Sequence, residues 1–216
     1  MQFKFSISAL ILLSLISITA FTNTAFAEND DKIVVMHTSS GLLIIEFFPD
    51  DAPNTVTNFL DLTQKGFYDN IIFHRIIKDF MIQGGDPLSK YDPDGDGYTN
   101  MEQWGTGDAG YEIEAEFNTI KHNRGIVSMA RGADVNSASS QFFIVHKDSN
   151  HLDGKYTAFG RLVTEESYDT LDKIANLRTI AKDLPSDLSA TQIIKTAVIT
   201  RADIENPPSI EELDRL

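Results

Sequence analysis

Residues 73–86 constrain the fold of this chain more than any other stretch. They form two short apolar runs joined by the polar pair Lys78-Asp79, and this pattern predicts a β-hairpin. Gly84 and Gly85 follow the second run. Because glycine tolerates unusual backbone angles and close approaches, we expect the second strand to end there.

The hairpin carries side chains that a strand does not need for packing alone. Arg75 offers a rigid fork of donors that is always charged, and Gln83 offers both a donor and an acceptor. Phe80 and Met81 add an apolar, adaptable surface. Arg75 alone could be an exposed strand residue whose stem lies along the surface. Together, these side chains predict a pocket that grips a backbone amide beside an apolar ring.

The hairpin also resembles the central motif of the cyclophilin family of peptidyl-prolyl isomerases. The residues that carry this resemblance are Phe73-His74-Arg75-Ile76-Ile77 and Phe80-Met81-Ile82-Gln83-Gly84-Gly85-Asp86. A second block follows in the family's order and near its spacing: Ser128-Met129-Ala130-Arg131, Ser140-Gln141-Phe142-Phe143-Ile144, Leu152-Asp153-Gly154-Lys155-Tyr156 and Phe159-Gly160. The resemblance covers roughly residues 32–200 and implies isomerase activity toward X-Pro bonds.

Residue roles come with this resemblance. It implies a catalytic set of Arg75, Phe80, Met81, Gln83, Phe143 and Leu152. It implies a substrate-binding set of Ala130, Arg131, Gln141, His151 and Tyr156. His151 stands where many members have a tryptophan, which argues against tight cyclosporin binding, and Tyr156 replaces a frequent histidine while keeping an aromatic wall. His74 we interpret as structural.

The remaining pattern predicts a mainly β domain. Apolar runs typical of strands occur at 33–36, 42–48, 125–129, 141–145, 156–163 and 193–200. Helical spacing predicts one helix over 53–65 and a second that contains Tyr168, Leu171, Ile174 and Ala175. Many strands with two distant helices favour a closed antiparallel barrel capped by two α-helices, and the resemblance implies eight strands. We expect the domain to span 28–204, with a loosely held tail at 205–216.

Residues 1–27 are different in kind. One lysine, Lys4, precedes a mostly apolar stretch at 7–18, and Ala25-Phe26-Ala27 is the small-x-small pattern of a signal-peptidase site. A membrane anchor is the alternative, but the apolar stretch is broken by serines and is shorter than the roughly 20 residues that span a bilayer. We therefore expect a signal peptide cleaved after Ala27 and export to a periplasm, a pseudoperiplasm or the exterior.

Charge and cysteine content limit the possible partners. The net charge is −14, which argues against nucleic acid and against anionic membrane surfaces. The absence of cysteine excludes a disulfide framework and a lipid-modified cysteine. The expected partners are proline-containing peptides and unfolded or nascent exported proteins. We expect a monomer with no stable membrane association after cleavage.

An acidic insertion occupies residues 88–110, and its segment 92–103 resembles the calcium loop of EF-hands. The candidate ligands are Asp92, Asp94, Asp96, Tyr98 through its carbonyl, Asn100 and Gln103. Gly97 provides the sharp turn, but the usual bidentate glutamate is replaced by Gln103 at the twelfth position. The pattern predicts a structural calcium ion bound at about 10⁻⁴–10⁻³ M; the alternative is a solvated acidic loop.

The leading hypothesis is a peptidyl-prolyl cis-trans isomerase that assists the folding of exported proteins. Rotation about X-Pro requires a donor aimed at the proline nitrogen and an apolar slot for the ring, so no cofactor is expected. Two alternatives remain. One is a proline-peptide-binding module without turnover, and the other is a calcium-binding protein that uses the barrel as a scaffold.

Overall fold

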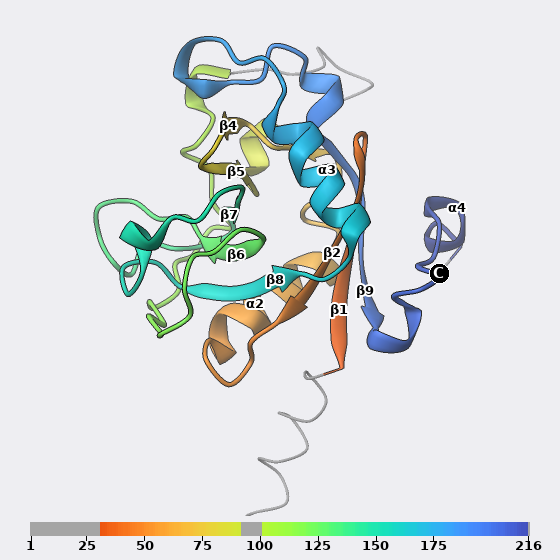
Figure 1. Ribbon diagram of the computed structural model, residues 1–216, viewed down its shortest axis with the longest axis horizontal. Coiled ribbons are helices and arrows are strands. Elements are labelled where there is room, and N and C mark those ends of the chain that lie inside the picture. Colours follow the sequence, from red (N-terminus) through yellow and green to blue (C-terminus); the bar gives the residue numbers. More distant parts are fainter. Residues whose placement is uncertain (1–30, 92–100, 216) are drawn as a thin grey trace, which may run out of the picture.

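The computed structural model describes residues 31–91 and 101–215. Within these ranges the chain forms one sheet of nine strands, all paired antiparallel (Figure 1). In chain order the strands are β1 (Lys32–Thr38), β2 (Gly41–Phe47), β3 (Ile71–Ile72), β4 (Arg75–Ile77), β5 (Met81–Gly84), β6 (Ile126–Met129), β7 (Phe142–Val145), β8 (Ala158–Leu162) and β9 (Gln192–Thr200). Their order across the sheet is β3-β9-β1-β2-β8-β6-β7-β5-β4.

The two end strands of this sheet are consecutive in the chain. β3 and β4 stand at opposite ends of the hydrogen-bonded order, yet only Phe73 and His74 separate them. The curled, mainly β antiparallel fold is therefore as expected. The described strands number nine where eight were expected, because the run from 71 to 77 changes partner. Before Phe73 it pairs with β9, and after His74 it pairs with β5.

Two helices of the described ranges pack on the sheet, as the helical spacing predicts, and a third is short. In the part of the chain that the structure describes, the α-helices are α2 (Pro53–Gln64), α3 (Glu165–Ala175) and α4 (Ile210–Leu213). α2 has proline in its first turn, where the missing N–H costs nothing. α3 is capped by Thr164, whose side chain accepts from the backbone N–H of Ser167. α2 packs against β9, and α3 packs against β2 (Figure 1).

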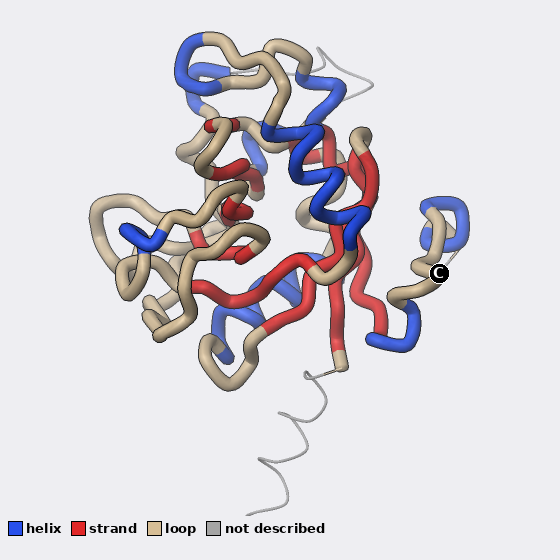
Figure 2. The backbone as a smooth tube through the Cα atoms, viewed as in Figure 1, coloured by secondary structure: helices blue, strands red, loops and turns tan. Residues whose placement is uncertain are grey.

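Short 3₁₀ helices lie in the loops. They are η1 (Pro87–Ser89), η2 (Met101–Gln103), η3 (Asn150–Leu152), η4 (Ala181–Asp183), η5 (Leu188–Thr191) and η6 (Arg201–Asp203). Figure 2 shows long loops gathered around β4 to β7, whereas the side of β1 and β9 consists of longer strands. The loops that could bind a ligand therefore surround one part of the sheet.

Alternation along the strands separates an inner core from an outer face. On β7, Phe142 and Ile144 belong to the main core, which also contains Phe59 of α2 and Leu171 of α3. The intervening Phe143 belongs to a different cluster on the outer side of the sheet. Successive residues of a strand point to opposite faces, so β7 contributes to the core with one face and to the outer surface with the other. Because the inner face is filled by side chains, a ligand must bind outside.

The C-terminal end of the chain contacts the strands β1 and β9. Ile204 packs against an outer apolar cluster of β1, β2 and β9. His37 Nε2 lies 2.8 Å from the carbonyl oxygen of Pro208, and Lys195 Nζ lies 3.1 Å from Asp214 Oδ1. The tail at 205–216 thus makes polar contacts with β1 and β9, which the sequence did not indicate.

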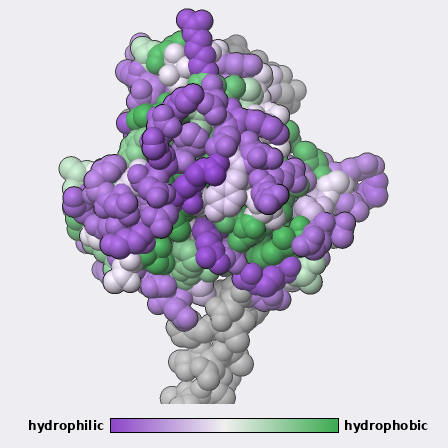
Figure 3. All heavy atoms as spheres, viewed as in Figure 1, coloured by the Kyte–Doolittle hydropathy of each residue, from purple (hydrophilic) through white to green (hydrophobic). Residues whose placement is uncertain are grey.

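The expected leader at 1–27 lies outside the described residues. Among the helices of the described ranges, none has the length and apolar character needed to cross a bilayer. The face in Figure 3 is largely hydrophilic, with hydrophobic residues in separate patches.

Candidate active site

A row of four residues crosses the outer face of the sheet. Arg75 on β4 pairs with Gln83 on β5, Gln83 pairs with Phe143 on β7, and Phe143 pairs with Ser128 on β6. Directly opposed residues of neighbouring strands point to the same face. The register therefore places the arginine, the amide and the aromatic ring side by side, although they are up to 68 positions apart in sequence.

The local chain geometry around this row is that of the predicted hairpin. The turn between β4 and β5 is closed by the N–H of Phe80, which donates to Ile77 O at 3.0 Å. Asp79 has a φ of 60°, and its N–H donates to His146 Nδ1 at 3.0 Å. Beyond the strand, Gly85 has a φ of 86°, which glycine adopts without strain. Hydrogen bonds thus fix the hairpin at its turn, and its second strand ends at the glycine pair, as predicted.

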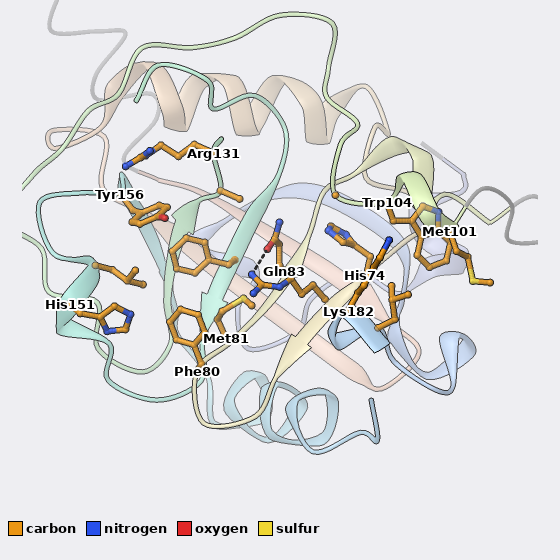
Figure 4. Close-up of a pocket in the computed structure, with 16 residues that line it drawn as sticks. His74, Phe80, Met81, Gln83, Met101, Trp104, Arg131, His151, Tyr156 and Lys182 are labelled. Carbon is orange, nitrogen blue, oxygen red and sulfur yellow. Dashed lines mark hydrogen bonds between the residues drawn. The ribbon is translucent and has the colours of Figure 1, made fainter. Parts of the chain in front are cut away.

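A cleft of about 580 Å³ opens over this row (Figure 4). All six residues predicted to be catalytic line it, together with four of the five predicted to bind substrate. These are Arg75, Phe80, Met81, Gln83, Phe143, Leu152, Ala130, Arg131, His151 and Tyr156. The fifth, Gln141, lines an adjoining hollow of about 260 Å³, which shares Gln83, Ala130 and Arg131 with the cleft.

The floor of the cleft is an apolar slot. Met81, Phe143 and Leu152 form one buried cluster, and Phe80 and Tyr156 pack against it. Each of the first three side chains is at most 7% exposed, so the floor is well supported from below. A slot of this kind can hold a small apolar ring and offers no group that would bond to it.

The aromatic wall of the slot is braced from behind. The ring of His122 stacks on Phe143 with a centroid separation of 6.1 Å. His122 is itself held by Ser128 Oγ at 3.0 Å and by Asp153 Oδ1, which accepts from its backbone N–H at 2.8 Å. Burial lowers the pKa of His122. The hydrogen bond to the Asp153 carboxylate acts in the opposite direction. The backbone N–H of His122 also holds the pKa of Asp153 well below its usual range.

Arg75 stands at the rim of the slot with its side chain about 42% exposed. Its Nε lies 3.4 Å from Asp183 Oδ2, and its terminal nitrogen donates to Gln83 Oε1 at 3.5 Å (Figure 4). Gln83 Nε2 donates to Gln141 Oε1 at 2.9 Å, and Gln141 Nε2 donates to Gly107 O at 2.8 Å. This chain of amides orients the Gln83 oxygen toward the guanidinium. Since a guanidinium has five N–H donors, others remain for a ligand.

The opposite end of the cleft is aromatic. Arg131 lies over the ring of Tyr156 at 4.8 Å and donates to the carbonyl of Lys155. Tyr156 meets Phe143 edge-on at 5.8 Å. His151 lies 5.5 Å from the ring of Phe80, at the place where a tryptophan is frequent in the family that the sequence resembles.

His74 precedes Arg75 in the chain and also lines the cleft (Figure 4), although its side chain is almost wholly buried. It is 3% exposed, and both of its ring nitrogens are buried without a hydrogen-bond partner. Burial lowers its pKa to about 4, the Asp86 carboxylate opposes this, and Arg75 adds to it. The ring is therefore neutral at pH 7. Its burial agrees with the structural interpretation made from the sequence.

Five lining residues escaped sequence reasoning: Met101, Trp104, Gly105, Lys182 and Leu184. They come from two loops that are distant in sequence from the hairpin and from each other. Trp104 is the single tryptophan of the chain and occurs in a polar loop, which is a usable signal. Nothing in the pattern of 176–190 points to the cleft.

The predicted calcium ligands Asp92, Asp94, Asp96, Tyr98 and Asn100 lie outside the described residues. Gln103 is described and ends η2, where its carbonyl accepts from the N–H and the hydroxyl of Thr106. Over 31–91 and 101–215, no group of three or more His, Cys, Asp or Glu could hold a metal ion. Calcium binding stays a prediction.

Comparisons with known proteins agree on one family. The model of the family described as cyclophilin type peptidyl-prolyl cis-trans isomerase/CLD matches residues 33–199. A peptidyl-prolyl cis-trans isomerase of Synechococcus elongatus is 42% identical, over 66% of this chain and 88% of that protein. Peptidyl-prolyl cis-trans isomerase 10 of Caenorhabditis elegans is 42% identical, over 70% of this chain and 87% of that protein.

A solved structure is similar as well. It is a cyclophilin type peptidyl-prolyl cis-trans isomerase of Cryptosporidium parvum, crystallised in the presence of the dipeptide Ala-Pro. The TM-score is 0.67 with 31% sequence identity, and the alignment covers 78% of this chain and 99% of that one.

Proposed function

This chain belongs to the cyclophilin-type peptidyl-prolyl cis-trans isomerases, and on that premise we propose that its cleft accelerates X-Pro rotation in exported polypeptides with Arg75 as the essential donor. The observation that carries the proposal is the row formed by Arg75, Gln83 and Phe143, which sets a permanent cation beside an apolar slot.

The reaction requires the amide to lose its resonance. Rotation about the peptide bond is opposed by about 18–20 kcal/mol, and uncatalysed exchange at X-Pro takes tens to hundreds of seconds. At a twist of about 90°, the proline nitrogen becomes pyramidal and regains a lone pair that accepts a hydrogen bond. A donor placed at that nitrogen stabilises the twisted state more than either planar state, which is the condition for catalysis.

Arg75 supplies this donor. Its guanidinium stays protonated at any ordinary pH, and its contacts with Asp183 and Gln83 fix the direction of the fork. A hydrogen bond to a charged group contributes about 1.5–3 kcal/mol, which corresponds to roughly ten- to a hundredfold in rate. The remaining acceleration must come from how the cleft fits the twisted peptide.

The slot and the amides provide that fit. Phe80, Met81, Phe143 and Leu152 hold the pyrrolidine ring while the carbonyl side turns. Gln83 binds the substrate backbone. The residues that precede proline lie along Ala130, Arg131 and Gln141 in the adjoining hollow, with His151 and Tyr156 closing the far end of the slot.

The test compares Arg75→Ala and Arg75→Lys with the parent in an isomerisation assay on a proline tetrapeptide. We expect kcat/KM to fall about ten- to a hundredfold in Arg75→Ala. Arg75→Lys should recover only part, since lysine keeps the charge but loses the planar fork. Arg178→Ala, an exposed arginine outside the cleft, is the matched control. An unchanged rate in Arg75→Ala with an intact far-UV spectrum would remove Arg75 from the mechanism.

The same assay separates an enzyme from a binding module. A module would bind the tetrapeptide but leave the cis-trans exchange rate of the parent unchanged. The half-exposed guanidinium beside the slot favours turnover, because binding a planar X-Pro amide does not require a charged donor at the proline nitrogen.

Export and calcium binding remain proposals that rest on sequence. The pattern at 1–27 supports clients that are exported proteins, and the mass of the secreted chain would test for cleavage after Ala27. Titration with calcium, followed by the isomerase assay with and without a chelator, would test whether residues 92–103 bind the ion and whether it affects the cleft.

A further inference from the structure

One part of the cleft lining, which we call the distal lobe, consists of Met101, Trp104, Lys182 and Leu184, with His74 and Gly105 beside them. Figure 4 shows Trp104, Met101 and Lys182 together on one side of Gln83, whereas Tyr156 and His151 lie on the other side. The distal lobe is thus continuous with the proline slot but separated from its far wall by the reactive arginine and its amide partner.

One wall of the distal lobe is a tight hairpin that ends at Leu184. Thr179 bridges Pro185, and the N–H of Ile180 donates to Leu184 O at 2.8 Å. At the tip, Lys182 and Asp183 have φ values of 62° and 60°, a region that side chains other than glycine rarely adopt. Such a turn persists when its surroundings hold it.

The anchor of this hairpin is the active-site arginine itself. Asp183 Oδ2 lies 3.4 Å from Arg75 Nε, and η4 packs against β4. The ion pair sets the Leu184 wall at a fixed position relative to the proposed donor. The opposite wall, Trp104, follows η2 in the loop before Gly105. Two independent loops therefore converge on one apolar surface next to the slot.

The path of a bound peptide decides what this surface meets. A peptide whose proline fills the slot enters on one side of the ring and leaves on the other. The hollow at Gln141, Ala130 and Arg131 takes the residues before proline. The side that remains leads over Arg75 to the distal lobe.

From this placement we infer that the distal lobe binds the side chain that follows proline and selects large apolar or aromatic residues there. The inference rests on the proposed function and adds to it a substrate preference. The walls of the distal lobe are the ring of Trp104, Met101 and Leu184, and Met101 is 46% exposed in the free protein. A bound apolar side chain covers this surface and removes it from water. The Lys182 ammonium at the rim stays in solvent.

The test uses peptides Ala-Ala-Pro-Xaa-Ala with phenylalanine, leucine, glycine or aspartate at Xaa. Exchange between the cis and trans forms is measured by NMR at equilibrium, so that no coupling protease imposes its own preference. We expect kcat/KM for the phenylalanine peptide to exceed that for the glycine peptide by about tenfold. In Trp104→Ala and in Leu184→Ala the ratio should fall to about two or less.

The matched control is Ile180→Ala. Ile180 belongs to the same hairpin and is 54% exposed, but it does not line the cleft, so its ratio should equal that of the parent. Far-UV circular dichroism melts establish that each variant is folded. Trp104 and Leu184 lie on different loops. If one of the two variants fails to fold, the other still tests the inference.

The inference is overturned by a parent ratio near one, or by a tenfold ratio that survives both lobe variants. A preference for aspartate over phenylalanine would also overturn it, since the charge of Lys182 would then dominate. A different result would contradict the proposed function. In that case, exchange of the glycine peptide would be equally fast with the parent and with Arg75→Ala.

Discussion

His74 makes a measurable prediction about stability and pH. Its ring is 3% exposed, neither nitrogen has a hydrogen-bond partner, and burial lowers its pKa to about 4 from an ordinary value of 6.5. The unfolded chain therefore binds a proton at pH values where the folded chain does not. The contribution of neutral His74 to the free energy of unfolding is therefore fully present above about pH 6.5, and it is lost as the pH falls toward 4.

The magnitude follows from the two pKa values. A difference of about 2.5 pH units corresponds to about 3 kcal/mol in full, of which about 2 kcal/mol is lost by pH 5. His74→Leu replaces the ring with an apolar side chain of similar volume and removes the titration. We expect this variant to equal or exceed the parent in stability at pH 8, because no buried nitrogen is left unpaired. At pH 5 its advantage should grow by about 2 kcal/mol.

The assay is urea unfolding of both proteins between pH 5 and pH 8, monitored by the fluorescence of Trp104. His74→Gln serves as a second variant in case leucine disturbs the packing. In parallel, the imidazole carbon resonance of His74 in the folded parent should not titrate above pH 5. A stability difference between parent and variants that is the same at pH 8 and pH 5 would refute the reasoning.

Two further predictions concern single residues that the fold requires. Gly85→Ala should lower the free energy of unfolding in urea by roughly 2 kcal/mol or more, because its φ is 86° and a Cβ would overlap the carbonyl oxygen of Ser140. The control is Gly110→Ala, at a φ of 87° with open space around it, which should cost about 1 kcal/mol. Equal costs for the two variants would contradict the overlap. Burial raises the pKa of Glu46, but hydrogen bonds from Arg201 and Arg161 outweigh this and leave it below 4.5, so its contribution to stability is lost as the pH falls through that lowered value. Glu46→Gln should lower the free energy of unfolding by about 1–3 kcal/mol at pH 7. Glu211→Gln, at an exposed pair with Arg215, should lower it by under about 0.5 kcal/mol. Similar losses for both variants in thermal or urea unfolding would show that the bonds from the two arginines to Glu46 do not stabilise the fold.

Short-range patterns predicted the elements well. The hairpin at 73–86 and the helix at 53–65 each depend on neighbours a few residues apart, namely turn residues, a first-turn proline and apolar spacing. The tail at 205–216 shows both kinds of information. Its short helix has a local signal, the capping box of Ser209 and Glu212, whereas its contacts with His37 and Lys195 join residues far apart in the chain, which a local pattern does not contain.

The candidate site divides in the same way. The residues predicted to form the proline slot stand in motifs that resemble a known family, so their positions in the sequence were sufficient to predict that they lie together, and they line one cleft. Trp104, Lys182 and Leu184 carry no motif. Their approach to the cleft follows from loops that are positioned by contacts such as Asp183 with Arg75 and Asp86 with Gly105.

The sequence by itself determined most of the strands, the two long helices and the family motifs that the chain carries, because alternation, turn residues and glycines act over a few positions. Only the tertiary structure decided that Arg75, Gln83 and Phe143 stand in one row, and that a distant hairpin meets Arg75. Cross-strand register and loop docking depend on contacts between residues far apart in the chain, and these exist only after the sheet has closed on its core.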